Sequence, residues 1–273
     1  MTTILITGTT SGLGRALAVE LAKTGATLLL HGRDDEQGKA LLTEVRDATG
    51  NDRLHWYRAD LASLAQVREL AAAVAADHPD LDVVVNNAGL GTSLPDGRQV
   101  SADGHELRFA VNYLAGYLLT TLLVPTLTAN APARVVLVSS AGQQAIDFDD
   151  VMLERGYGGV RAYCQSKLAQ IMFGFDLAAD PAYTGVTVNS LHPATYMPTK
   201  MVRAAGVTPV GSIADGVTAT ARLAVGADVA SVTGRYFNGL REARANAQAY
   251  DAKARRRLRE LSDELVAAYG RPL

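Results

Sequence analysis

The segment Thr2–Leu21, TTILITGTTSGLGRALAVEL, constrains the fold of this chain more than any other. Ile4–Ile6 is a short apolar run typical of a strand buried on both faces, and an amphipathic helical pattern begins a few residues later. Between them, Gly8 permits a tight turn, Gly12 allows close approach of a pyrophosphate, and Gly14 lets the helix lie close to the strand. Such a turn directs backbone N–H groups and the positive end of a helix dipole at one point. The spacing G-x3-G-x-G therefore indicates a phosphate-binding turn, with an ordinary glycine-rich loop as the alternative.

Composition narrows the class of protein. Hydrophobic residues make up 48% of the 273 residues and charged residues 20%, and the net charge of −2 argues against nucleic acid or an anionic membrane as partner. The single cysteine, Cys164, excludes an intrachain disulfide and fits a cytoplasmic location. The five histidines are scattered singly, so we expect no metal site. We also expect neither a signal peptide, because the first strand begins so close to Met1, nor a membrane span.

The rest of the chain alternates predicted strands and helices, which is typical of a doubly wound parallel sheet. The further predicted strands are 27–31, 54–58, 81–85, 133–138, 186–191 and 234–237. The further predicted helices are 35–48, 63–77, 104–129, 163–179, 213–224 and 248–269. We therefore expect an α/β Rossmann fold, a single domain over residues 1–273 with about seven parallel strands and helices on both faces.

The end of the second predicted strand bears on the choice of nucleotide. A sheet that binds NAD usually has a carboxylate there for the ribose 2′-OH, but this chain has Gly32 followed by Arg33, which could pair with a 2′-phosphate. This favours NADP(H), with NAD(H) still possible, although Arg33 could be a solvated loop charge and Asp34 only a helix cap. Asp60, after the third strand, could accept a hydrogen bond from an adenine amino group or cap the helix near Ser63.

Tyr163 and Lys167 stand at i and i+4 in a predicted helix, so their side chains share one face. A nearby cation favours the phenolate and lowers the tyrosine pKa from about 10, which would suit a general acid or base. Most such pairs in arbitrary helices are surface pairs, so the pattern needs support from elsewhere in the chain. Asn112 lies in the apolar run 104–129 and, if buried, must hold either the backbone or a polar site.

Taken together, these motifs resemble the short-chain dehydrogenase/reductase superfamily over nearly the whole chain. Thr7–Gly14 matches the family's T-G-x3-G-x-G turn, and Asn86–Gly89 matches its N-N-A-G. Ser140 stands where the family has a catalytic serine, and Tyr163 and Lys167 follow it by 23 and 27 positions, as Y-x3-K. The stretches AYCQSKLAQIMF and GRYF are most similar to the retinol-dehydrogenase-like branch.

The resemblance implies an NADP(H)-dependent oxidoreductase that interconverts a carbonyl and an alcohol. Tyr163 would transfer the proton, Lys167 would lower its pKa and bind ribose, Ser140 would stabilise the reacting oxygen, and Asn112 would hold a water beside Lys167. The cofactor contacts expected from the motifs and strand ends are Gly8, Thr10, Ser11, Gly12, Leu13, Gly14, Arg33, Asp60, Leu61, Asn87, Ala88, Gly89, Tyr163, Lys167, Pro193 and Thr199.

Two loops, about 143–160 and 195–211, are expected to border the substrate, and the second is long enough to act as a mobile lid. Their large side chains predict a mainly apolar small molecule: Phe148, Met152, Tyr157, Tyr196 and Met197.

One departure from the family concerns residue 194, where the common P-G is Pro193-Ala194. Because alanine disfavours positive φ, we expect this loop to differ slightly.

The alternatives are an epimerase or dehydratase on the same scaffold and a nicotinamide-nucleotide sensor without turnover. A homodimer or a homotetramer is compatible with the resemblance.

Overall fold

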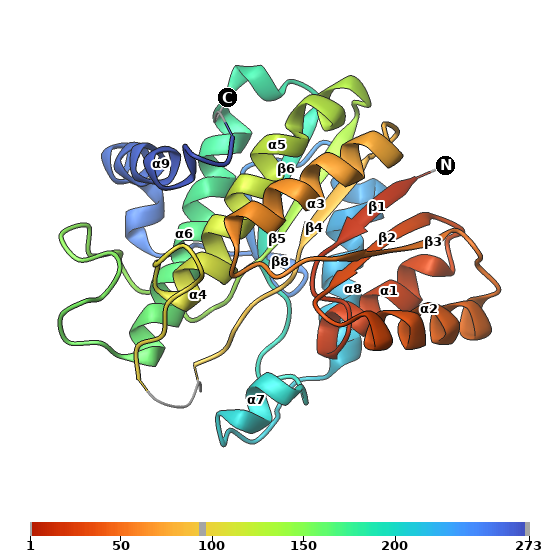
Figure 1. The fold of residues 1–273 in the computed structure, drawn as a ribbon, viewed down its shortest axis with the longest axis horizontal. Helices are drawn as coiled ribbons and strands as arrows, with labels where there is room; N and C mark the ends of the chain where they lie inside the picture. The colour runs from red at the N-terminus through yellow and green to blue at the C-terminus, as the bar shows by residue number, and fades with distance from the viewer. Residues whose placement is uncertain (1, 93–96, 271–273) are drawn as a thin grey trace.

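The computed structural model describes residues 2–92 and 97–270, which form one mostly parallel sheet between two helical layers. Its strand order is β3-β2-β1-β4-β5-β6-β7-β8 (Figure 1). The strands are β1 Thr3–Ile6, β2 Thr27–Gly32, β3 Leu54–Arg58, β4 Val83–Asn86, β5 Ala133–Val138, β6 Val186–His192, β7 Arg235–Asn238 and β8 Arg241–Glu242. The order reverses between β1 and β4, and a doubly wound sheet binds its ligands beside this switch point, at the carboxyl ends of the strands.

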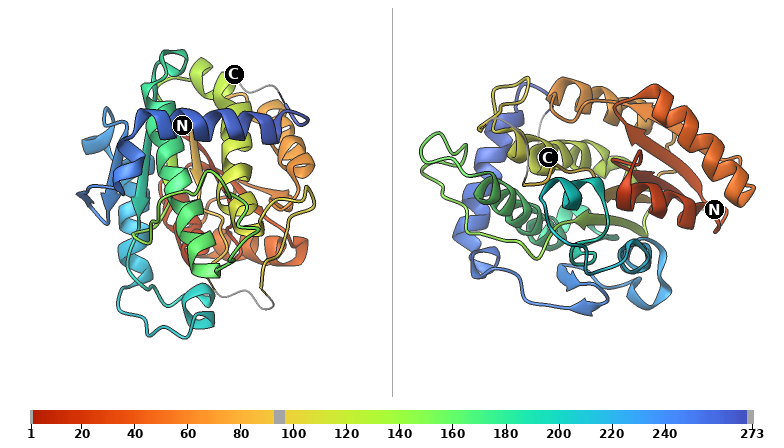
Figure 2. Two further views of the ribbon diagram at one scale, coloured as in Figure 1. Left: turned by 90° about the vertical axis from the view of Figure 1, so that its left-hand side faces the viewer. Right: turned by 90° about the horizontal axis from the view of Figure 1, so that it is seen from below.

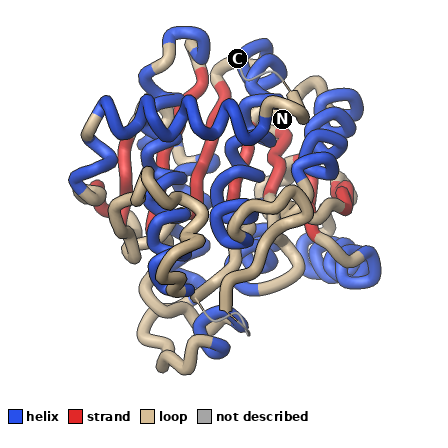
Figure 3. The backbone as a smooth tube through the Cα atoms, turned by 60° about the vertical axis from the view of Figure 1, so that its left-hand side comes forward, coloured by secondary structure: helices blue, strands red, loops and turns tan. Residues whose placement is uncertain are grey.

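The helices that cover the sheet come from the segments between the strands. They are α1 Gly12–Ala22, α2 Asp35–Thr49, α3 Leu64–Asp77, α4 Leu107–Phe109, α5 Ala115–Ala129, α6 Gly159–Ala179, α7 Lys200–Ala204, α8 Ile213–Val225 and α9 Ala252–Val266. α1, α2 and α8 pack on one face, whereas α3, α5 and α6 pack on the other. α9 crosses the outer side of α5 and α6 (Figure 2). The loops that follow the strands gather at one edge (Figure 3).

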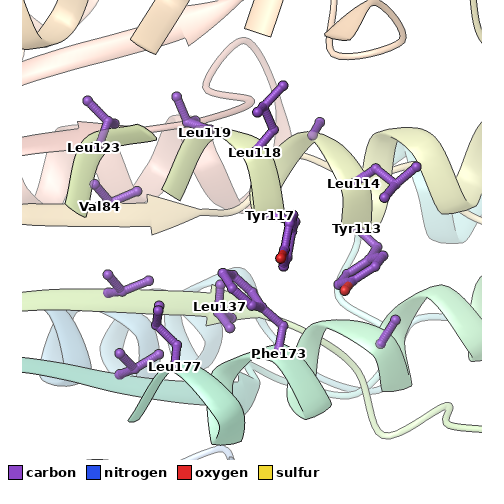
Figure 4. Packing of buried hydrophobic residues seen from close by; sticks show 14 of the residues in the cluster. Val84, Tyr113, Leu114, Tyr117, Leu118, Leu119, Leu123, Leu137, Phe173 and Leu177 are labelled. Atoms are coloured by element: carbon purple, nitrogen blue, oxygen red, sulfur yellow. The ribbon is translucent and has the colours of Figure 1, made fainter. Parts of the chain in front are cut away.

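The alternation of side chains along each strand explains the two layers, because successive residues point to opposite faces. In β1, Leu5 packs with the α3, α5 and α6 layer, whereas Ile4 and Ile6 pack with the α1, α2 and α8 layer. The strands therefore bury both faces, as their continuous apolar runs predict. Figure 4 shows the larger cluster, in which Tyr113 and Tyr117 pack against Phe173 of α6.

The predicted fold class is confirmed, with differences at the ends of elements. The sheet has an eighth strand, because Gly239 adopts a φ of 57° and turns the chain back so that β8 pairs antiparallel with β7. α6 begins four residues before Tyr163, at Gly159, since Gly158 still has an extended backbone. The C-terminal helix begins at Ala252 rather than 248, because the Asp251 carboxylate caps its first turn.

The long predicted helix over 104–129 is not uniform. Helical structure begins at Leu107, where the preceding Glu106 caps Phe109, and residues Ala110–Leu114 form a π-helical turn before α5. The helical stretch Leu107–Ala129 has the length and mean hydropathy, 1.4, of a membrane-spanning helix, which the sequence had not predicted. It is the central helix of its layer and 78% of this apolar window is buried, as in the core of a folded domain.

The basic face of α9 makes defined ion pairs with neighbouring elements. Arg255 and Arg259 pair with Asp176 of α6, and Arg257 donates to the Asp149 carboxylate and the Phe148 carbonyl. These arginines attach α9 to α6 and to the 143–158 loop.

Candidate active site

The glycine turn between β1 and α1 has the geometry of a phosphate cradle. Gly8 and Gly12 have φ values of 71° and 57°, and a Cβ on Gly14 would lie 2.2 Å from the Gly8 carbonyl oxygen. Within the described part of the chain, the side chain of N-cap residue Ser11 accepts no hydrogen bond from the first turn of α1. The backbone N–H groups of the first turn of α1 are thus available to an anion. The glycine turn itself has no room for larger side chains.

Residues of the β4 end hold this turn in place. The Asn87 side-chain amide donates to the carbonyls of Thr7 and Gly8 at 2.8 and 3.0 Å. The Thr7 hydroxyl in turn accepts hydrogen bonds from the backbone N–H groups of Asn87 and Ala88. Asn87, predicted to contact the cofactor, therefore braces the cofactor turn. Thr7 was not predicted to have a role, although it is part of the matched motif.

His31 is a further support that the sequence motifs did not reveal. Its Nδ1 accepts a hydrogen bond from the Gly8 N–H at 3.2 Å, and its Nε2 lies 3.1 Å from the Ala59 carbonyl, to which it must donate. Burial lowers the pKa of His31 from 6.5 to about 4. The charges of Asp60 and Arg33 have smaller effects on this pKa, since Asp60 raises it and Arg33 lowers it. Neutral His31 thus joins the ends of three strands beneath the turn.

We expect acid to destabilise the fold through His31. Between pH 6.5 and 4 the unfolded chain binds a proton that the folded chain excludes, so stability falls by on the order of 3 kcal/mol as pH decreases. His31→Gln, which cannot titrate, should weaken this slope when urea unfolding is followed at several pH values. An unchanged slope would contradict the assignment of a neutral, buried His31.

The nucleotide-specificity turn is shaped by Trp56 of β3. A Cβ on Gly32 would lie 2.5 Å from the Trp56 ring and 2.8 Å from the Thr10 methyl group, so no side chain fits there. Arg33 is exposed and reaches the Asp60 carboxylate at 4.0 Å, a weak contact that leaves its guanidinium accessible. Asp34 caps α2, as its alternative interpretation predicted.

Asp60 and Leu61 follow β3 beside this turn. The Asp60 carboxylate accepts a hydrogen bond from the Ala62 N–H at 3.0 Å, and Ser63 caps α3 instead. The helix-cap alternative for Asp60 is therefore wrong, and the same Oδ1 lies 4.0 Å from the Arg33 guanidinium. Leu61 is buried.

Ser140, Tyr163 and Lys167 converge at the carboxyl end of β5. An ideal Cβ on Gly142 would lie 3.5 Å from the Ser140 Oγ and 3.6 Å from the Tyr163 ring. The Ser140 hydroxyl and the Tyr163 ring therefore border the same small space beside Gly142. The Lys167 Nζ is 5.8 Å from the centre of the Tyr163 ring and donates to the Val138 carbonyl and the Gln170 Oε1, both at 3.0 Å. The structure therefore brings together the three residues that the motifs selected.

The pKa values differ from the sequence expectation. Burial raises the pKa of Tyr163, and a hydrogen bond with Ser140 acts in the opposite direction. Burial lowers the pKa of Lys167 from 10.5 to about 7. The prediction that Lys167 lowers the Tyr163 pKa was wrong for the protein alone, because desolvation outweighs the attraction of a partly neutral amine almost 6 Å away.

Asn112 is part of the same site but has fixed partners. Its Oδ1 accepts a hydrogen bond from the Leu90 N–H at 2.6 Å, and its amide donates to the Leu90 carbonyl and the Ser166 Oγ. A Cβ on Gly89 would lie 3.3 Å from both the Asn112 Oδ1 and the Lys167 Nζ. The backbone-holding role of Asn112 is thus evident, and it also adjoins Lys167.

The segment after β6 lies across the phosphate turn. Ala194 does not adopt positive φ, as expected, and the left-handed residue is Tyr196, with a φ of 45°. A Cβ on Gly12 would lie 3.2 Å from the Thr199 methyl group, which places Thr199 against the turn. Thr199 also caps α7, a short helix within the segment 195–211 that was predicted to be a loop.

Few of the apolar loop residues predicted to face the substrate are free to do so. The Phe148 ring packs under Arg257, the Met152 sulfur accepts the Glu106 N–H, and the Tyr157 hydroxyl bonds to Arg108 and Glu106. Met197 packs against α8, as its sulfur lies 2.5 Å from an ideal Cβ on Gly216. Of the five, Tyr196 is the exposed one, at 50%.

A cavity of about 370 Å³ lies elsewhere, between α5, α6 and α9. Its walls include Tyr113, Tyr117, Asp176 and Arg255, and none of Ser140, Tyr163 or Lys167. The converging polar groups, and not this cavity, therefore locate the candidate site.

Comparisons with known proteins agree with the geometry. Residues 2–208 match the family model described as short chain dehydrogenase. The chain is 36% identical to retinol dehydrogenase 13 of Homo sapiens, with 97% of this chain and 84% of that protein aligned. It is 35% identical to human retinol dehydrogenase 14, over 97% of this chain and 86% of the other.

Solved structures show the same fold. An uncharacterised protein from Mycobacterium paratuberculosis superposes with a TM-score of 0.78 at 28% identity, covering 98% of this chain and 94% of the other. A short chain dehydrogenase from Shigella flexneri, complexed with NADP, superposes with a TM-score of 0.71 at 26% identity, covering 88% and 97%.

Proposed function

Because this chain belongs to the short-chain dehydrogenase/reductase family, in its retinol-dehydrogenase-like branch, we propose that it is an NADP(H)-dependent oxidoreductase that interconverts a carbonyl and an alcohol. The observation that carries the proposal is the convergence of Ser140, Tyr163 and Lys167 beside the glycine turn. The proposal covers residues 1–273 as one functional unit, since a single sheet runs from β1 to β8.

The residues present fit a nicotinamide dinucleotide. The turn from Gly8 to Gly14, with its uncapped helix N-terminus, would hold the pyrophosphate. Asp60 and Leu61 would border the adenine, Ala88 and Gly89 the adjoining ribose, and the remaining predicted contacts are Thr10, Leu13, Pro193 and Thr199. When bound, the dinucleotide supplies or accepts the hydride.

The preference for NADP(H) is supported by the contacts of Gly32. An aspartate or glutamate at position 32 would collide with Trp56 and Thr10, so this chain cannot place there the carboxylate that holds a ribose 2′-OH. Arg33 is exposed beside that point and offers a planar, bidentate cation for a 2′-phosphate.

Arg33→Ala should weaken binding of NADPH by about 10- to 100-fold, the value of a charge-assisted hydrogen bond, and that of NADH much less. Fluorescence of Trp56, the single tryptophan, reports both affinities. Arg46→Ala, at the far end of α2 where Arg46 pairs with Asp52, is the control and should leave both unchanged. An equal loss for the two nucleotides, or tighter binding of NADH by the wild type, would refute the NADP preference.

The proposed chemistry assigns the proton to Tyr163. With its pKa raised by burial, Tyr163 is protonated at neutral pH and can donate to a carbonyl oxygen that is being reduced. The Ser140 hydroxyl would donate a hydrogen bond to the same oxygen and stabilise its developing charge. Lys167, with a pKa of about 7, can return a proton toward Tyr163 at neutral pH. Asn112 would hold Leu90 and Ser166 around this pair.

The proposed substrate is a mainly apolar small molecule. The names of the two human relatives indicate an apolar alcohol as their substrate, and Tyr196 presents an exposed aromatic ring near the lid. A screen of NADPH oxidation against aldehydes, including retinal, and against ketones and quinones tests this directly. Reduction of none of them would count against the enzyme and favour the nucleotide sensor.

The cytoplasmic location and assembly as a homodimer or homotetramer stay predictions. Cell fractionation and light scattering of the purified protein would test them.

A further inference from the structure

The backbone of Ser140 is fixed by side chains and not by the sheet. The β5–β6 hydrogen-bond ladder ends with the Ser139 N–H, which donates to the Leu191 carbonyl at 2.8 Å. One residue later, the Ser140 carbonyl accepts two hydrogen bonds from elsewhere in the chain. The Tyr236 hydroxyl of β7 donates to it at 3.0 Å, and the Gln143 amide donates at 2.9 Å.

Both donors are themselves held in place. Tyr236 is 4% exposed, and burial raises its pKa to about 12, so its hydroxyl stays protonated at any working pH. The Gln143 Oε1 accepts the Asn246 N–H at 2.7 Å, which ties this side chain to the segment before α9. Two elements distant in sequence therefore converge on one carbonyl.

That carbonyl matters because the Ser140 hydroxyl follows the orientation of its backbone. The Ser140 Oγ accepts the Gly142 N–H at 3.0 Å, so the turn 140–142 moves as one unit with the hydroxyl. A rotation of the peptide after Ser140 would displace Oγ from the space it shares with Tyr163. Small displacements of this kind lower the rate of a reaction without weakening the binding of the cofactor.

We propose that Tyr236 and Gln143 are positioning residues for Ser140, which together hold its carbonyl and thereby aim its hydroxyl at the reacting oxygen. The inference rests on the proposed function for its effect on rate, whereas the brace itself is a property of the protein alone. Because both donors serve one acceptor, either one keeps the carbonyl satisfied, and loss of both leaves a buried carbonyl without a partner.

A double-mutant cycle follows from this arrangement. Tyr236→Phe and Gln143→Met should each lower kcat by a few-fold, and the double variant by about 100-fold, well beyond the product of the single effects. KM for NADPH should stay unchanged. Effects of either substitution that do not depend on the other, such as loss of the Asn246 contact, cancel in the cycle.

Tyr117→Phe is the matched control. Tyr117 is also 4% exposed and donates its hydroxyl to a partner distant in sequence, Asp263 of α9, and its ring packs on Phe173, ten residues along α6 from Tyr163. It should lower thermal stability about as much as Tyr236→Phe while leaving kcat unchanged. Equal kcat losses in the two variants would show that Tyr236 acts only through stability.

Hydrogen exchange of the segment 139–146, measured on the protein without cofactor, tests the brace without turnover. Exchange should rise slightly in each single variant and strongly in the double variant. Exchange equal to that of the wild type would overturn the proposal, as would single effects on kcat that simply multiply. If the wild type reduces no carbonyl, the proposed function fails, and the exchange measurement still decides whether Tyr236 and Gln143 hold Ser140.

Discussion

Replacing Tyr163 with phenylalanine should reduce turnover by about a thousandfold or more while leaving NADPH affinity within about twofold of wild type. The change removes one hydroxyl and retains the ring, so packing of α6 is preserved. The lost group is the proposed proton donor, and general acid–base catalysis contributes factors of this size. kcat is measured with the best carbonyl found by screening, and affinity by quenching of Trp56.

The same variant separates an enzyme from a nucleotide sensor. In a sensor, Tyr163 would be a packed aromatic whose hydroxyl is satisfied by Ser140, and its loss would change stability or affinity but not a rate. Tyr57→Phe is a suitable control, since Tyr57 lies on β3 and its hydroxyl donates to Asp77 at the end of α3, away from the site. Turnover of Tyr163→Phe at the wild-type rate would disprove the proposed mechanism.

Local patterns in the sequence predicted the parts of the site that depend on local structure. The glycine turn follows from steric rules that act within eight residues, and the strands follow from apolar runs buried on both faces. Tyr163 and Lys167 share a helix face because of helical periodicity alone. The positions of these groups relative to Ser140 required the resemblance to a known family.

Contacts between distant segments could not be predicted in this way. Tyr236 lies 96 positions from Ser140, and no periodicity links them. Arg108 is 1% exposed although it is charged, because Glu106, the Tyr157 hydroxyl and the carbonyls of Gly91 and Thr92 surround it. A sequence shows a charge but not the partners that permit its burial.

The direction of the Tyr163 pKa shift also could not be predicted from the sequence. The spacing of Tyr163 and Lys167 showed that the two side chains are neighbours, and on that basis the phenol pKa was expected to fall. The shift in fact depends on how much water each group retains, and that is decided by the helices and strands packed around α6.

Lys167→Met should abolish turnover, weaken NADPH binding and change the dependence of stability on pH. Turnover is lost and binding is weakened because the ammonium is the proposed contact of the nicotinamide ribose and lies beside Tyr163. Stability changes because burial lowers the Lys167 pKa from 10.5 to about 7. A protonated Lys167 therefore destabilises the folded state relative to the unfolded chain, in which the ammonium is hydrated.

The sign of that pH effect is fixed by the two pKa values. Below pH 7 the lysine is protonated in both states and the full burial penalty applies, whereas above pH 10.5 it is neutral in both and the penalty is absent. Wild-type stability should therefore rise relative to Lys167→Met by about 3–4 kcal/mol between pH 7 and pH 10, as measured by urea unfolding. Gln170→Met removes an acceptor of the same ammonium but leaves the lysine, and its pH dependence should follow the wild type. A constant difference between wild type and Lys167→Met across this range would show that Lys167 is solvated in the folded protein, and its proposed roles would then lose their physical basis.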